Sequence, residues 1–209
     1  MKTKHLNLKV ALITNPVGKD EEGHKIINYF RKHKVTTKIR KVPWLKTPFI
    51  VILSDSKGNR EWFPYISEVN PFLKKVDLTL VAKSSLVYVD YYQIIREASQ
   101  RMINFASQHG IPSFINLGGS PFTPKLSNSL RGKKVIAVQT NLEENQIRNA
   151  EPLVRSIYNH VKPQVAIVTL GSKCLRFGCT LGTINCTLER SFEVFSQKEV
   201  EEFLRKWPR

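Results

Sequence analysis

Residues 86–117 of this chain read LVYVDYYQIIREASQRMINFASQHGIPSFINL, and this stretch decides the fold class. A short apolar run ending in Asp90 is followed over 94–109 by apolar residues at helical spacing, and then by a second apolar run over 112–117. Gly110 and Pro112 are typical of the point where a helix ends. The spacing predicts two neighbouring parallel strands joined by a helix, because parallel strands need a crossover of this length.

The same alternation of strands and helices extends over most of the chain. Further strands are predicted over 8–14, 47–54, 60–66, 134–139 and 165–170. Further helices are predicted from Asp20 or Glu21 to His33, over 142–160 with Pro152 as a kink or break, and over 196–207. The runs 47–54 and 60–66 flank a Gly-containing turn and predict a β-hairpin. We therefore expect an α/β fold with a mostly parallel sheet flanked by helices.

The composition is that of a globular protein. Of the 209 residues, 41% are hydrophobic and 24% are charged, which is enough apolar surface for a sizeable core. The sequence has no apolar run of eighteen residues, so no membrane-spanning helix and no membrane partner is expected. Charges interrupt the apolar residues of the N-terminus, which is not typical of a signal peptide, and a cytoplasmic location is the expectation.

The charge balance is strongly basic. Thirty-three Lys and Arg against seventeen Asp and Glu give a net charge of +16. Such an excess raises affinity for polyanions in general. The basic residues are dispersed, with the densest stretch over 31–46, so both a solvated basic surface and a non-specific nucleic-acid-binding surface remain open.

Polar and glycine residues follow four of the predicted strands. Parallel sheets bind ligands at the carboxyl ends of their strands, which makes these positions candidates for a binding site. They are Asp90, 116–119, 139–141 and 169–171.

Asn141 and Glu144 are the first candidate binding pair. Asn141 is placed to act as a helix N-cap with Glu144 as its capping-box partner. In the alternative interpretation the helix N-terminus attracts phosphate, and Glu144 holds a hydrated Mg²⁺ beside it. Thr169 and Gly171 are the second pair, suited either to a phosphate or ribose contact or to a plain turn.

Several common catalytic patterns are absent from the sequence. It has no H-E-x-x-H, G-x-S-x-G or G-x-G-x-x-G, and no G-x-x-x-x-G-K-[ST] phosphate-binding loop. The stretch 18–23 carries three acids before a predicted helix, and we interpret it as structural because acids suit the positive end of a helix dipole.

The order of the segments resembles the ribokinase-like, or PfkB-type, sugar and nucleoside kinases. Val17-Gly18-Lys19-Asp20-Glu21-Glu22-Gly23 is similar to the family's VG-x-D-x-x-G, and Ser54 to Arg60 is similar to its D-x-x-G-x-R turn. Asn141-Leu142-Glu143-Glu144 matches N-x-x-E, and Val168-Thr169-Leu170-Gly171 matches V-T-x-G. The resemblance covers about residues 8–178.

This resemblance implies an activity and a set of ligands. The activity is transfer of the γ-phosphoryl group of ATP to a hydroxyl of a sugar or nucleoside, with Mg²⁺ as the cofactor. Asn141 and Glu144 would serve Mg²⁺ and phosphate, with Glu144 as the metal ligand. Thr169 and Gly171 would line the nucleotide site. Residues 35–66 would form a small β-rich lid.

The departures from the family pattern carry expectations of their own. The family's G-A-G-D motif, which supplies the catalytic base and an anion hole, has no match, and neither has its N-terminal G-G-x-x-x-N segment. We therefore expect residues 1–209 to form a single, incomplete ribokinase-like domain with reduced or lost activity. The alternatives are a nucleotide-binding pseudokinase or scaffold and a basic nucleic-acid-binding protein. An exposed sheet edge would also favour a homodimer.

Overall fold

A computed structural model describes residues 8–56, 60–66, 68, 70–170 and 173–174. The described chain divides into two compact units, one over 9–80 and the other made of residue 8 and the described residues from 81 onward. A single domain over 1–209 with residues 35–66 as a lid stays a prediction, and the helix predicted over 196–207 lies outside the described residues.

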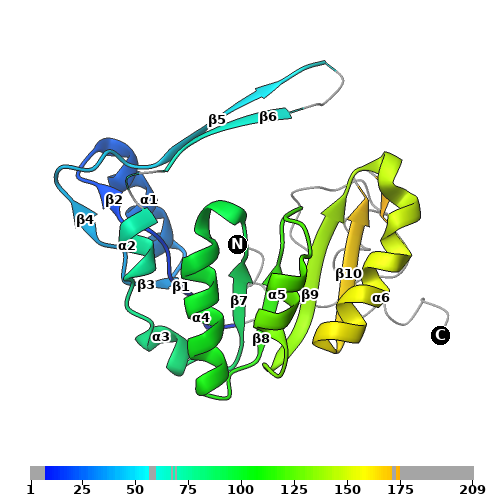
Figure 1. Ribbon diagram of the computed structural model, residues 1–209. Coiled ribbons are helices and arrows are strands. Elements are labelled where there is room, and N and C mark those ends of the chain that lie inside the picture. The colour runs from blue at the N-terminus through cyan, green and yellow to red at the C-terminus, as the bar shows by residue number, and fades with distance from the viewer. Residues whose placement is uncertain (1–7, 57–59, 67, 69, 171–172, 175–209) are drawn as a thin grey trace. The chain divides into compact units, whose positions relative to one another are not determined.

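The second unit is built on a sheet in which four strands are parallel (Figure 1). The strands are β7 (Val87–Asp90), β8 (Ser113–Asn116), β9 (Val135–Leu142) and β10 (Val165–Leu170), with β11 (Lys173–Cys174) antiparallel to β10. Their order in the sheet is β11-β10-β9-β8-β7. The predicted mostly parallel sheet is confirmed, and β10 has the predicted bounds.

Three α-helices lie on one face of this sheet, drawn in front of the strands in Figure 1. They are α4 (Arg96–Gln108), α5 (Pro124–Leu130) and α6 (Ala150–Val161), with short 3-10 turns at η2 (Gln93–Ile95) and η3 (Glu144–Asn149). The sheet residues on the helix-covered face are buried: Val89, Ile115, Val138 and Val168. Burial of these side chains and of Ile103 and Ile157 on the helices makes the core of the unit.

Two predictions about this unit are wrong. The helix predicted over 142–160 begins only at Ala150, because β9 continues to Leu142 alongside β10. Pro152 neither kinks nor breaks the helix, since it lies in the first turn, where a backbone N–H has no partner within the helix. In β7 only alternate residues are buried, and Tyr88 is 53% exposed.

The first unit contains short parallel strand pairs, a helix and a hairpin. β1 (Ala11–Leu12) pairs with β3 (Thr36–Thr37), and β2 (Val17–Gly18) pairs with β4 (Lys41–Val42). The predicted helix is α1 (Glu21–Lys32), and the predicted hairpin is β5 (Phe49–Ser54) with β6 (Arg60–Tyr65). Two short helices, α2 (Asn70–Lys74) and α3 (Thr79–Ala82), follow. None of the helices in the described part of the chain is long and apolar enough to cross a membrane.

Asp20 holds the start of α1 to the segment that follows β4. Its Oδ1 accepts hydrogen bonds from the Gly23 amide at 2.9 Å and from the Thr47 hydroxyl, and its Oδ2 accepts one from the Thr47 amide at 2.7 Å. These bonds, led by the one from the hydroxyl, lower the pKa of Asp20 to about 2. A Cβ on Gly23 would lie 2.4 Å from the Gly18 carbonyl oxygen, so glycine is required there. Residues 18–23 thus have a structural role, as the sequence predicted, because they attach the start of α1 to the segment after β4.

Candidate functional site

A row of polar side chains lies at the carboxyl edge of the parallel sheet. Asp90, Asn116 and Gln139 are neighbours in register on β7, β8 and β9. Two residues further along β9, Asn141 is in register with Thr169 on β10. Because side chains alternate along a strand, all five lie on the face opposite the helices. The sequence predicted that these residues come together at the edge, and the strand register confirms it.

Hydrogen bonds fix the side chain of Asn116 in this row. Its Nδ2 donates to Oδ1 of Asp90 at 2.9 Å, and its Oδ1 accepts from the Gly118 amide at 3.1 Å. The backbone joins the same strands, since Asn116 O accepts from the Tyr91 amide at 2.7 Å. The end of β7 and the turn after β8 are therefore held in one arrangement.

Gly118 and Gly119 form a turn in which both residues have positive φ, at +54° and +81°. A Cβ on Gly118 would lie 2.1 Å from Cε1 of Tyr92, and a Cβ on Gly119 would lie 3.0 Å from Nδ2 of Asn141. The backbone of this turn thus approaches two side chains more closely than any other residue type would allow. Tyr92 was not identified from the sequence, although an aromatic residue just after a strand end could have drawn attention to it.

Asn141 is not the helix cap that its sequence pattern allowed. It lies within β9 and is exposed, and the residue at the N-cap position of α6 is Asn149, whose side chain makes no capping bond. The capping interpretation is wrong because pairing with β10 keeps residues 141–142 extended. The Asn141 amide is left facing Gly119 instead.

Of the other predicted site residues, the structure describes the side chain of Thr169 and the backbone of Glu144. Glu144 is the first residue of η3, two residues beyond the end of β9. The Thr169 hydroxyl donates to the Thr140 carbonyl oxygen at 3.5 Å, a long bond that leaves its oxygen able to accept another. Gly171 lies outside the described residues. The structure therefore brings Asn141 and Thr169 together and places the backbone of Glu144 close by in the chain.

Two tyrosines beside Asp90 have raised pKa values. Partial burial of the ring, and after it the negative charge of Asp90, raises the pKa of Tyr88 to about 12. The same two causes in the same order raise the pKa of Tyr92. Both phenols are therefore protonated at neutral pH, so they add neutral hydroxyl groups next to the carboxylate.

The described residues hold no cluster of three or more His, Cys, Asp or Glu side chains that could bind a metal ion by themselves. Mg²⁺ is commonly held in proteins by one or two carboxylates together with phosphate oxygens and water. Asp90 at the end of β7 is a carboxylate at this edge of the sheet, and the backbone of Glu144 follows the end of β9.

Solved structures with the same arrangement of elements are sugar and nucleoside kinases. Adenosine kinase from Sinorhizobium meliloti matches with a TM-score of 0.65 and 17% identity, over 82% of this chain and 56% of that one. Ribokinase from Thermotoga maritima matches with a TM-score of 0.60 and 13% identity, over 94% of this chain and 81% of that one. Fructokinase from Halothermothrix orenii matches with a TM-score of 0.62 and 15% identity, over 82% of this chain and 66% of that one. No family model and no curated protein matches the sequence.

The fold is that of the ribokinase-like, PfkB-type kinases, as the order of the sequence motifs predicted. At these identities the likeness establishes the fold alone. The chain spans 56% of the length of the adenosine kinase and 57% of that of a fructokinase from Xylella fastidiosa.

Proposed function

We propose that this chain binds ATP together with Mg²⁺ at the carboxyl edge of the β7–β10 sheet. The reaction that goes with the site is transfer of a phosphoryl group to a hydroxyl of a sugar or nucleoside. The observation that carries the proposal is the close approach of the Gly119 backbone to the side chain of Asn141. A Cβ placed on Gly119 would lie 3.0 Å from Nδ2 of Asn141, and Asn141 is in register with Thr169 on the next strand. A glycine turn facing an exposed amide at the end of parallel strands suits a phosphate group, because the ligand can approach both backbone and side chain. The structural neighbours, which are an adenosine kinase, a ribokinase and a fructokinase, support the same class of ligand.

Each residue of the site has a role in this proposal. The Asn141 amide donates a hydrogen bond to a phosphate oxygen, and the Thr169 hydroxyl contacts the phosphate or ribose. Glu144 would hold a hydrated Mg²⁺, and Gly171 would line the nucleotide site. Mg²⁺, when bound, would neutralise part of the negative charge of the phosphate groups. The fixed Asp90–Asn116 pair orients the neighbouring edge of the site.

Phosphoryl transfer by these 209 residues is expected to be slow or absent. The sequence contains no Gly-Ala-Gly-Asp, the motif that would supply a general base and an anion hole. A general base contributes roughly 10²–10⁴-fold to a rate, and loss of one anion-hole donor costs about 10²–10³-fold. The second candidate is therefore a pseudokinase, which binds nucleotide without turnover. A phosphotransfer assay over sugars and nucleosides separates the two.

Thermal unfolding with and without Mg-ATP tests the binding site. ATP at a hundred times its dissociation constant should stabilise the folded chain by about 2.7 kcal/mol. For a protein of this size that corresponds to roughly 5–11 °C in Tm. Replacing Asn141 with alanine removes a hydrogen bond to a charged group, worth about 1.5–3 kcal/mol, so ATP should bind roughly 10–100-fold more weakly.

Asn149 provides the matched control. It is also an exposed asparagine, eight residues along the chain, and its side chain makes no capping bond. Asn149→Ala should leave ATP affinity unchanged. A melt that Mg-ATP does not shift, or equal loss of affinity in the two variants, would show that the site is elsewhere or absent.

A further inference from the structure

The basic charge of the chain is not explained by a kinase fold. Between residues 31 and 46 there are seven Lys and Arg and no Asp or Glu, and all seven are exposed. Only Lys38 forms an ion pair with a described carboxylate, that of Asp77 at 2.5 Å. The other six cations of this stretch face solvent without a described acidic partner, which leaves a local excess of positive charge in the first unit.

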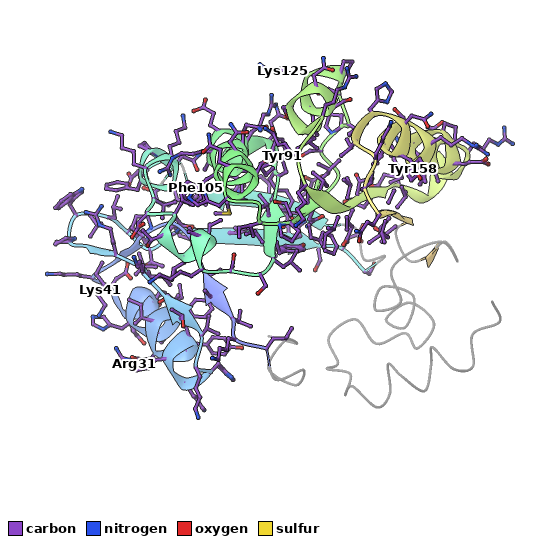
Figure 2. The ribbon with its side chains drawn as sticks, turned by 90° about the horizontal axis from the view of Figure 1, so that it is seen from below. Arg31, Lys41, Tyr91, Phe105, Lys125 and Tyr158 are labelled. Atoms are coloured by element: carbon purple, nitrogen blue, oxygen red, sulfur yellow. The ribbon has the colours of Figure 1, made fainter. Side chains whose placement is uncertain are left out.

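Two of these cations flank one side of α1. Arg31 Nη1 donates to Oδ1 of Asn28 at 3.3 Å, and Lys41 Nζ on β4 lies 3.3 Å from Nδ1 of His24. His24, Asn28 and Arg31 are spaced four and three residues apart, so they form one stripe along the helix. Figure 2 labels Arg31 and Lys41 beside this helix.

The stripe is longer than one phosphate group. Seven residues of helix rise about 10 Å, so the cations at its two ends lie too far apart to hold a single phosphate. The two cations are suited instead to contact successive phosphate groups of a polyanion. The side chains of the stripe also include an amide and an imidazole, which can hydrogen-bond phosphate and sugar oxygens.

An exposed tryptophan adjoins the same basic segment. Trp44 is 77% exposed, the highest fraction among the exposed large hydrophobic side chains of the described residues. It lies in the chain between Lys41 and Lys46, both of them exposed. An aromatic ring that is open to solvent and flanked by cations can stack on an unpaired base while the cations contact the backbone.

We infer that Arg31 and Lys41 beside α1, together with the exposed Trp44 three residues after Lys41 in the chain, bind single-stranded nucleic acid. A duplex fits less well, since its base faces are covered by stacking and offer no place for Trp44. Insertion of α1 into a major groove is also disfavoured, because Glu21 and Glu22 in its first turn would meet phosphates. An anionic membrane is the competing polyanion.

Fluorescence anisotropy of a labelled oligothymidylate of about twenty nucleotides, measured on the full chain, tests the surface. The double variant Arg31→Gln/Lys41→Gln removes two cations from the stripe. The slope of log affinity against log salt should then decrease in magnitude by about 1.4, at roughly 0.7 per phosphate contact. The control is Lys83→Gln/Lys125→Gln, which removes the same charge from exposed positions in the second unit and should leave the slope nearly unchanged.

The stacking role of Trp44 has its own matched control. Trp44→Leu should weaken binding roughly 5- to 100-fold. Trp62→Leu, at a 57% exposed tryptophan of the β5–β6 hairpin, should not change it. Equal effects of the two charge pairs, equal effects of the two tryptophans, or binding to phosphatidylserine vesicles but not to the oligonucleotide would overturn the inference. None of these readouts involves ATP, so failure here is distinct from failure of the nucleotide site.

Discussion

Replacing Gly118 with alanine should destabilise the protein by more than its backbone conformation alone explains. Gly118 has a φ of +54°, and a left-handed conformation costs a residue with a Cβ about 1–2 kcal/mol. The new Cβ would also lie 2.1, 2.6 and 2.8 Å from three ring atoms of Tyr92. Ordinary carbon contacts are about 3.5–4.0 Å, so the ring has to move.

The size of the second effect follows from the burial of Tyr92. This side chain is 42% exposed, so it buries roughly 100 Å² of surface, and this area can be lost when the ring moves. At about 25 cal/mol per Å² the ring loses at most ~2.5 kcal/mol when it moves out. Gly118→Ala should therefore cost about 1–2.5 kcal/mol beyond the backbone term.

Gly110→Ala is the control because it carries only the backbone term. Gly110 has a φ of +67°, and a Cβ there meets nothing within 4 Å. Urea denaturation of both variants gives the two free energies of unfolding. In a Tyr92→Ala background the extra cost of Gly118→Ala should disappear, since the ring is gone. The steric reasoning is refuted if the two glycine variants are equally stable, or if the extra cost survives without the ring.

Three further predictions concern single side chains. The pKa of Asp20 is lowered to about 2, chiefly by the Thr47 hydroxyl, so its stabilising effect is complete above pH ~3.8 and is lost as the pH falls toward 2. Acid denaturation of Asp20→Asn should therefore be less steep over that range than that of the parent. Tyr88 should ionise near pH 12, so Tyr88→Phe should remove a late step from the ultraviolet absorbance titration, whereas an unchanged curve would contradict the burial argument. Thr123→Ala removes the N-cap bond that its Oγ1 accepts from the Leu126 amide at 3.2 Å, and it should lower the free energy of unfolding by about 1 kcal/mol in a urea titration; no change would mean that the cap contributes nothing.

Elements with strong local patterns were predictable from the sequence. The helix α4 ends before Gly110, as its C-terminal pattern predicted, and Gly110 has the positive φ that such a position needs. The helix α5 was missed because its seven residues are too few to show a periodic apolar face. Its start was nevertheless marked in the sequence, since Thr123 followed by Pro124 is a typical N-cap and first helical residue.

The candidate site was predictable only to the level of which strand ends would meet. Parallel strands place their carboxyl ends at one edge, so Asp90, Asn116 and Asn141 could be grouped from the sequence alone. The contact of Tyr92 with Gly118 depends on the path of two loops about 26 residues apart, and no local pattern encodes it.

Asn141 shows why a short motif cannot settle the role of a residue. An asparagine three residues before a glutamate is equally compatible with a helix cap and with a ligand contact, because both uses need an amide beside a helix start. The choice is made by a partner 28 residues away, since pairing with Thr169 extends β9 through residue 142 and moves the helix start to Ala150. An amide that caps no helix and lies against a glycine turn is then available to a ligand. For this reason the loss of ATP affinity in Asn141→Ala, compared with Asn149→Ala, tests the chemistry of the site and not the stability of a helix.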